Sequence, residues 1–388
     1  FAAGNNGNTA LEPANAKNVI GIGGSSGKND VYAQSSKGPS KAGGEGVLLL
    51  APATNIISAK VDTSSTSLNN EFISKTGTSM ATPLAASTIG VLEQMIREGW
   101  LLGENDIISE TDINNLRPIW IQNYSDEGTL LLGQGFIPSG PLLRSLATAA
   151  TSEVTGAQHS SGTVNPRFDS IQGWGRLNLG TLIDWDDIET SIQNGNTISP
   201  SNGIWLHDSF RQKRTDGALP SAILTDRLEE GRNSGAGERP IDQLMSQPLT
   251  TSGLNGPFLK QGEMVSWNLT PNKKVIEKNG ELIIQLAWAD LPLEMGHDDL
   301  QVCISFNNVH SCGNDLNGGY SNIYSHIEHA KNAVSPEYSN EGIRIPSGQI
   351  ANVSNIQISV EAVNIVGGNR GGIGIGGDKI GFALTVIG

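Results

Sequence analysis

Ser79 is the residue whose surroundings could best support nucleophilic chemistry. It lies in the small-residue turn Thr76-Gly77-Thr78-Ser79-Met80-Ala81-Thr82-Pro83. Apolar residues follow at helical spacing: Leu84, Ile89, Val91, Leu92, Met95 and Ile96. This pattern predicts a serine in the first turn of a buried helix, where the free N–H groups and the positive dipole end favour an anion. A serine that forms an acyl-enzyme needs that environment, although an ordinary N-cap serine fits the same pattern.

A serine nucleophile also needs oxyanion donors and a base. The candidate donors are the backbone N–H of Ser79 and the side-chain amide of Asn5 in the turn Gly4-Asn5-Asn6-Gly7, although asparagine in such a turn is also a common turn former. The histidines are at 159, 207, 297, 310, 326 and 329, all after Ser79. Their polar contexts predict surface histidines, so the sequence offers no oriented base.

The elements that would position Ser79 are strands of a mostly parallel sheet. The apolar runs at 18–23 and 47–51 predict buried parallel strands, because strands covered on both faces read as continuous apolar segments. A short strand is expected at 72–74, before the helix that carries Ser79. A second helix is expected at 141–150, where Pro141 suits the first turn. These elements indicate an α/β domain.

The rest of the chain changes character twice. Residues 186–255 are rich in Asn, Ser, Gly, Arg and Glu, which is typical of a polar insertion or linker. From Gly262 onward, short apolar runs alternate with turn residues, which predicts an antiparallel β-sandwich. The predicted organisation is therefore an α/β domain at 1–185, a linker at 186–255 and a β-sandwich at 256–388.

Composition and cysteine usage restrict the setting. The 388 residues carry a net charge of -14, which argues against nucleic-acid or anionic-membrane partners, and no apolar run approaches the roughly 20 residues of a membrane span. Cys303 and Cys312 flank a predicted hairpin, so a disulfide is a candidate pairing, and two cysteines alone make a weak metal site. Glycosylation sequons begin at Asn123, Asn268 and Asn352. Together these features favour an extracellular or lumenal protein.

Several segments resemble the subtilases, the subtilisin-like serine proteases. Gly77-Thr78-Ser79-Met80-Ala81-Thr82-Pro83 resembles their nucleophile motif, and Phe1-Ala2-Ala3-Gly4-Asn5-Asn6-Gly7 resembles their oxyanion strand and turn. Residues 16–20, 35–39, 50–53 and 172–176 are similar to further family segments, in the family's order. The chain departs from common family residues at Leu84, which replaces a histidine, and at Ala53, which replaces a glycine.

The resemblance implies roles for individual residues. Ser79 would be the nucleophile, Asn5 the side-chain oxyanion donor, and Ala2, Ala3 and Gly4 one wall of the substrate pocket. In this family the triad order is Asp, His, Ser, so both partners would precede Phe1. We therefore expect the C-terminal part of a serine endopeptidase acting on polypeptides. Its Asp and His would lie on the N-terminal portion of its own precursor, and no organic cofactor is expected.

The C-terminal region resembles the jelly-roll domain of the oxidatively stable alkaline subtilases. The similar segments are Leu286-Ala287-Trp288-Ala289-Asp290, Asp298-Asp299-Leu300 and Gly381-Phe382-Ala383-Leu384-Thr385-Val386. The resemblance implies a possible calcium site, with Asp298, Asp299 and Asp315 as candidate ligands, although solvated turn carboxylates explain these residues equally well. Gln301 stands where this domain usually has an aspartate, which weakens that site.

A second hypothesis assigns no catalysis to the chain. The absence of a base, the long polar insertion and the sandwich would also suit a structural or adhesive extracellular protein that retains the subtilase fold. The sequence upstream of Phe1 distinguishes the two hypotheses, because Asp-Thr/Ser-Gly and His-Gly-Thr segments there would support the enzyme.

Overall fold

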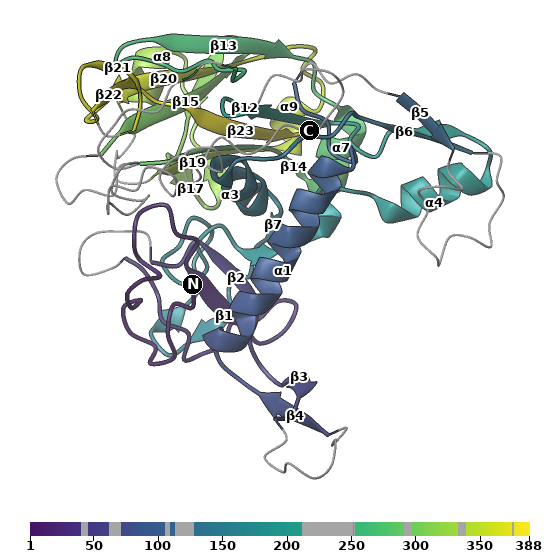
Figure 1. Ribbon diagram of the computed structural model, residues 1–388, viewed down its shortest axis with the longest axis vertical. Coiled ribbons are helices and arrows are strands. Elements are labelled where there is room, and N and C mark those ends of the chain that lie inside the picture. The colour runs from purple at the N-terminus through teal and green to yellow at the C-terminus, as the bar shows by residue number, and fades with distance from the viewer. Residues whose placement is uncertain are drawn as a thin grey trace, which may run out of the picture. The chain divides into compact units, whose positions relative to one another are not determined.

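A computed structural model describes ten ranges of the chain (Figure 1). They are residues 1–39, 46–61, 71–104, 109–112, 128–211, 251, 253–290, 297–332, 339–374 and 376–388. Contacts divide the chain into two compact units: unit 1 comprises Phe1–Gly90 and Thr151–Asn178, and unit 2 comprises Val91–Ala150 and Leu179–Gly388. This division is not the continuous one expected from the sequence, and the predicted domain limits at 185 and 255 remain predictions.

Unit 1 is built on a four-stranded sheet in the order β1-β2-β10-β7. Strands β1 (Ile22–Ser25), β2 (Leu49–Pro52) and β10 (Arg176–Leu177) are parallel, and β7 (Thr151–Ser152) is antiparallel to β10. The apolar runs predicted as parallel strands thus overlap β1 and β2, and every residue of β1 is buried, as expected for a covered sheet. Ala2 joins the edge of β1 through a single parallel bridge to Ile22.

Helix α1 (Thr78–Arg97) confirms the long helix predicted behind Ser79. Its buried side chains recur with helical spacing on one face, at Ala81, Ala85, Leu92, Met95 and Ile96. Leu84 and Val91, which belong to the predicted apolar pattern, are exposed. The apolar residues of α1 therefore extend around more of the helix than the face that is buried.

A β-hairpin precedes α1 in unit 1. Strands β3 (Ile56–Ala59) and β4 (Phe72–Lys75) pair antiparallel, which confirms the short strand expected at 72–74. The chain then turns through Gly77 into α1.

Unit 2 contains two four-stranded antiparallel sheets. One consists of β12 (Ile204–Asp208), β23 (Phe382–Ile387), β14 (Glu281–Trp288) and β19 (Asn340–Pro346). The other consists of β13 (Met264–Leu269), β20 (Ile356–Asn364), β15 (Asp299–Phe306) and β16 (Val309–Cys312). Buried residues of both sheets, among them Trp288, Phe382 and Ile358, share one apolar core. The antiparallel region expected after Gly262 is therefore present.

Regular elements occupy the first part of the predicted polar linker. Helix α4 (Trp185–Gln193), β11 (Thr197–Ile198) and β12 lie within or across 186–208, and β12 pairs with β23 along its whole length. Sequence reading missed β12 because it ends in His207 and Asp208, which are polar yet buried. Residues 212–250 and 252 of the predicted linker lie outside the described residues.

Helix α3 (Gly140–Ala149) packs against β14 and β23, and it confirms the second predicted helix (Figure 1). The Ser139 hydroxyl caps its N-terminus by accepting from the N–H of Leu142 at 3.2 Å. Two buried arginines hold this helix on the sheet. Arg144 donates to the Trp288 carbonyl, and Arg344 donates to the Thr148 carbonyl at 3.0 Å and to Glu281 at 3.0 Å.

The remaining elements are short. Those of unit 1 are β8 (Gln158–His159) and β9 (Gly162–Thr163). Those of unit 2 are β5 (Ser109–Asp112), β6 (Thr129–Leu132), η2 (Leu179–Thr181), α7 (Lys273–Asn279), β17 (Leu316–Asn317), β18 (Tyr320–Ser321), α8 (Ile327–Lys331), α9 (Ser347–Ile350), β21 (Arg370–Ile373) and β22 (Gly377–Lys379).

Candidate active site

Ser79 is the second residue of α1 and is exposed. The turn before it is fixed, because the N–H of Gly77 donates to the Ala53 carbonyl at 2.8 Å and the Gly77 carbonyl accepts from Met80 at 2.9 Å. Within the described part of the chain, neither the N–H nor the hydroxyl of Ser79 has a protein partner. The residue therefore presents a nucleophilic oxygen and an unused amide donor at the same helix N-terminus.

Thr78 fixes the orientation of the Asn5 amide. The backbone N–H of Thr78 donates to Asn5 Oδ1 at 2.8 Å, and its Oγ1 hydroxyl donates to the same oxygen at 3.1 Å. Oγ1 also accepts from the N–H of Gly4 at 3.2 Å, and Thr78 is fully buried. Because both donors engage Oδ1, the amide cannot flip without losing them, so Nδ2 is the atom left to donate outward.

Gly77 allows the close approach between this turn and Asn5. Its φ is 148°, and a Cβ there would lie 3.3 Å from Asn5 Oδ1 and 3.4 Å from Nδ2. A side chain at this position would be strained and would crowd the amide. The sequence analysis identified Ser79 and Asn5 but missed the role of Thr78, and the only local signal was a hydroxyl residue directly before the serine.

The predicted wall of the substrate pocket is only partly accessible. Ala3 is fully buried in a cluster with Val31 and Val47, so its side chain supports the core, and its place in the pocket wall remains a prediction. Ala2 and Gly4 are half-buried on either side of it. They remain candidates for contact with a substrate.

His159 is not the surface histidine that its polar sequence context predicted. It is the one histidine that the sequence places in unit 1, and it is 6% exposed. Its Nε2 lies 2.7 Å from the Ser35 carbonyl, and its Nδ1 accepts from the N–H of Ser161 at 3.1 Å. These partners assign the proton to Nε2 and leave neither nitrogen to take a proton from Ser79.

His207 in unit 2 also contradicts the surface prediction. It is 3% exposed, and its Nδ1 lies 2.6 Å from Glu104 Oε2. Its Nε2 lies 3.4 Å from the hydroxyl of Ser209, which donates to the Pro257 carbonyl at 2.8 Å. This Ser-His-Glu array resembles a triad in composition, but Ser209 is fully buried and committed to the backbone. By contrast, His326 and His329 are exposed, as predicted.

The three candidate calcium ligands are not gathered into one site. Asp298 accepts from the N–H of Val366 at 2.8 Å, and Asp315 accepts from Asn322 at 2.8 Å and from Tyr324 at 2.7 Å. Burial raises the pKa of the Asp299 carboxyl, which disfavours its charged form. Within the described ranges, no group of three or more His, Cys, Asp or Glu side chains could hold a metal ion. These residues do not fit a preformed calcium site, and calcium binding remains a prediction.

Cys303 and Cys312 form a disulfide across the paired strands β15 and β16, with Cα atoms 4.1 Å apart. Asn268 and Asn352 of the sequons are exposed, whereas Asn123 lies outside the described residues. In the part of the chain that the structure describes, no helix has the length and apolar character needed to cross a bilayer.

Comparison with known proteins points to one family for the first part of the chain. Residues 1–175 match the sequence profile of the subtilase family. A curated relative, the serine protease/ABC transporter B family protein tagD of Dictyostelium discoideum, is 26% identical over 256 residues. The aligned region covers 58% of this chain and 12% of the relative, so the chain spans a small fraction of that protein's length.

Two solved structures are similar over parts of the chain. The prenylagaramide maturation protease PagA is 17% identical with a TM-score of 0.27, over 50% of this chain and 48% of that one. A cold-adapted subtilisin-like serine proteinase is 28% identical with a TM-score of 0.20, over 24% of this chain and 30% of that one. At these TM-scores, neither structure supports an argument about how this chain is arranged.

Proposed function

We propose that the chain is the serine-bearing part of an endopeptidase that hydrolyses polypeptides through an acyl-enzyme on Ser79, because residues 1–175 match the sequence profile of the subtilase family. The observation that carries the proposal is the pair of donors at the start of α1. Asn5 is held by Thr78 so that Nδ2 remains available, and the N–H of Ser79 is unused among the described residues.

The chemistry follows from these donors. Ser79 Oγ attacks the scissile carbonyl carbon, and its proton passes to a histidine base. The carbonyl oxygen becomes an oxyanion that accepts from Asn5 Nδ2 and from the N–H of Ser79, and the dipole of α1 adds to this stabilisation. The protonated base then gives its proton to the leaving amine as the C–N bond breaks, and water repeats the sequence to release the acid.

The base and its carboxylate partner come from another polypeptide segment. The one histidine of unit 1, His159, uses both ring nitrogens inside the fold. In the subtilases the Asp and the His precede the serine, so we assign them to the N-terminal portion of the same precursor. That portion is the partner this site requires.

The proposal extends to unit 2 and to the cellular setting. The two antiparallel sheets around a common core support a jelly-roll domain after the catalytic part. The disulfide between Cys303 and Cys312 supports an extracellular or lumenal location, because such bonds persist in oxidising compartments. Asp298, Asp299 and Asp315 would assemble a calcium site only after side chains rearrange.

Active-site labelling tests the proposal. A fluorophosphonate probe should label the full-length precursor, or the chain combined with its upstream segment, and it should not label the Ser79→Ala variant. Asn5→Ala is expected to slow labelling by about 100-fold or more, the factor measured when subtilisin loses its corresponding amide. If Ser79 is not labelled when the upstream segment is present and folded, the non-catalytic structural or adhesive role replaces the enzymatic one.

A further inference from the structure

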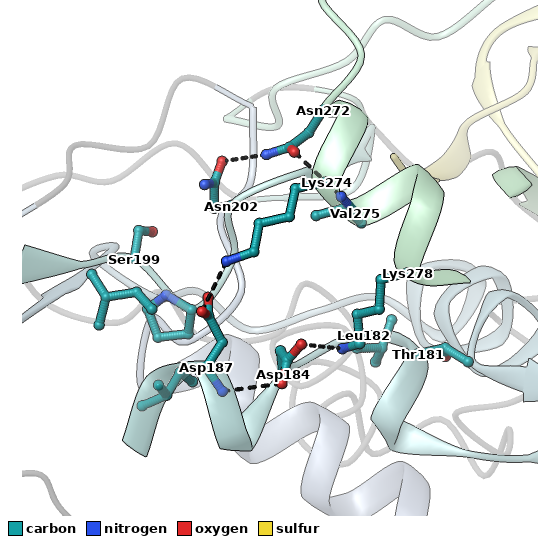
Figure 2. A pocket seen from close by; sticks show the side chains of 13 residues that line it. Thr181, Leu182, Asp184, Asp187, Ser199, Asn202, Asn272, Lys274, Val275 and Lys278 are labelled. Atoms are coloured by element: carbon teal, nitrogen blue, oxygen red, sulfur yellow. Dashed lines mark hydrogen bonds and ion pairs between the residues drawn. The ribbon is translucent and has the colours of Figure 1, made fainter. Parts of the chain in front are cut away.

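Unit 2 holds a small pocket between helices α4 and α7 that the proposed peptidase chemistry does not use (Figure 2). Its floor is apolar, and Leu182 and Ile188 are almost fully buried there. Its volume is about 90 Å³. Pockets that enclose drug-sized ligands measure roughly 300–1,000 Å³, so this one fits a single short aliphatic group.

Charges of both signs face each other across the pocket. Asp184 is the N-cap of α4, Asp187 lies in the first turn of α4, and Lys274 and Lys278 come from α7 (Figure 2). Lys274 Nζ lies 2.8 Å from Asp187 Oδ1, and Lys278 Nζ lies 3.2 Å from Asp184 Oδ2. The rim therefore has a balanced charge and offers both an ammonium and a carboxylate to a ligand.

The inner ion pair is anchored by additional bonds. Asp184 caps α4 by accepting from the N–H of Asp187 at 3.1 Å, and Lys278 also donates to the Gly180 carbonyl at 3.2 Å. Burial pushes the pKa of the Asp184 carboxyl up, but the Asp187 amide and Lys278 more than offset this effect and hold the pKa below its ordinary value. These bonds tie the pair to the fold, and the lowered pKa of Asp184 favours its charged form.

The outer ion pair can open. The side chain of Lys274 is 74% exposed and that of Asp187 is 38% exposed. Exposed pairs of this kind contribute only about 0–1 kcal/mol, because water solvates the separated charges well. In Figure 2, Lys274 reaches from α7 to Asp187 beside the pocket, so its movement would leave both charged groups available. Opening therefore exposes an ammonium, a carboxylate and an apolar floor together.

We propose that this pocket binds an α-amino acid with a short aliphatic side chain. The side chain enters toward Leu182 and Ile188, the ligand carboxylate pairs with Lys274, and the ligand ammonium pairs with Asp187. Binding separates Lys274 from Asp187. A ligand with one charge would pair with only one of these two residues and leave the other without an ionic partner. The site thus selects a zwitterion over a singly charged analogue.

Three probes with the same side chain test this selection on the full chain. Leucine carries both charges, N-acetylleucine carries only the carboxylate, and leucinamide carries only the ammonium. Amide shifts in TROSY spectra should move on leucine addition at Asp187, Ser199 and Lys274, which line the pocket. We expect leucine to bind up to about fivefold more tightly than either analogue, a factor that corresponds to about 1 kcal/mol, the upper value for one exposed ion pair.

Neighbouring residues provide matched control variants. Lys274→Gln and Asp187→Asn should each weaken leucine binding by up to about fivefold, the effect of losing one exposed ion pair. Lys273→Gln and Asp186→Asn remove the same charges from the adjacent positions on the same helices, which do not line the pocket, and should leave the affinity unchanged. Lys274→Arg should retain binding, and thermal unfolding checks that each variant is folded.

The proposal is overturned if leucine moves no pocket amide, if the three probes bind equally, or if Lys273→Gln weakens binding as much as Lys274→Gln. None of these results depends on peptidase activity, so the pocket and the proposed function can fail separately.

Discussion

Replacing Thr78 by valine tests whether this residue positions the oxyanion donor. Valine matches threonine in shape but removes the Oγ1 hydroxyl, which donates to Asn5 Oδ1 at 3.1 Å and accepts from the N–H of Gly4 at 3.2 Å. The backbone bond from Thr78 to Oδ1, at 2.8 Å, remains. The variant therefore loosens the amide without removing it.

The size of the effect follows from these bonds. Loss of one neutral hydrogen bond to Oδ1 is worth about 1 kcal/mol, and the Gly4 N–H left without its acceptor adds to this. The upper bound is loss of the whole donor, about 2.7–4 kcal/mol in subtilisin. We expect acylation to slow about tenfold, which corresponds to about 1.4 kcal/mol of transition-state stabilisation.

The assay is the rate of acyl-enzyme formation, measured by stopped-flow with an activated ester on the protein that includes its upstream segment. Thr78→Ser keeps the hydroxyl and should react at nearly the wild-type rate. Thr82→Val is a control in the same helix, because its hydroxyl donates to the Thr78 carbonyl at 2.9 Å and does not touch Asn5. For Thr78→Val, the acylation rate should fall while KM stays nearly unchanged, because the oxyanion donors act mainly on the transition state.

The decisive comparison is a double-mutant cycle with Asn5→Ala. If Thr78 acts by holding the Asn5 amide, its replacement should have little effect once that amide is gone. The reasoning is refuted if Thr78→Val slows acylation by the same factor in both backgrounds, because an independent effect on Ser79 or on helix stability would then be responsible.

Three further predictions concern unit 2. Burial raises the pKa of Glu341 well above 4.5, so its contribution to stability is present below pH 4.5 and is lost as the pH rises through the folded-state pKa. In urea unfolding, the free energy of unfolding of Glu341→Gln should therefore fall less toward alkaline pH than that of the wild-type protein. If this free energy has the same pH dependence in both proteins, the prediction is contradicted. Arg344→Met removes the guanidinium that donates to the buried carboxylate of Glu281 at 3.0 Å and should destabilise the protein by about 3–5 kcal/mol, and a loss below 1 kcal/mol in the same assay would show that the pair is dispensable. The double variant Cys303→Ser, Cys312→Ser should have a free energy of unfolding about 2–3 kcal/mol lower than the wild type, the loop-closure value for a separation of 9 residues. The wild-type protein in reductant should show the same free energy of unfolding as this variant.

Local sequence signals predicted the parts of the site that depend on neighbouring residues. The turn around Gly77, the start of α1 and the strands β1 and β2 were expected because small residues, helical spacing and continuous apolar runs act over a few positions. The exposed Leu84 shows the limit of this reasoning. Periodicity identifies the faces of a helix that are apolar, but only tertiary packing decides which of them is covered.

Long-range partners explain what sequence reading missed. Thr78 acts on Asn5 across 73 positions, and His159 is held by Ser35 across 124 positions. His207 is buried because Glu104, 103 positions away, satisfies it. A polar residue is expected at the surface unless such a partner is known, so β12 was assigned to a linker for the same reason.

Under the proposed function, the active site separates into a part that is already organised in this chain and a part that would have to be brought to it. Asn5 is oriented by Thr78, its approach is permitted by Gly77, and the N–H of Ser79 is fixed by the start of α1, all within unit 1. Donors held in place before the reaction need no reorganisation when the oxyanion forms. Under the proposed function, the segment that carries the histidine would have one task, which is to place a base beside Ser79 Oγ, and the preformed donors would then convert that encounter into acylation.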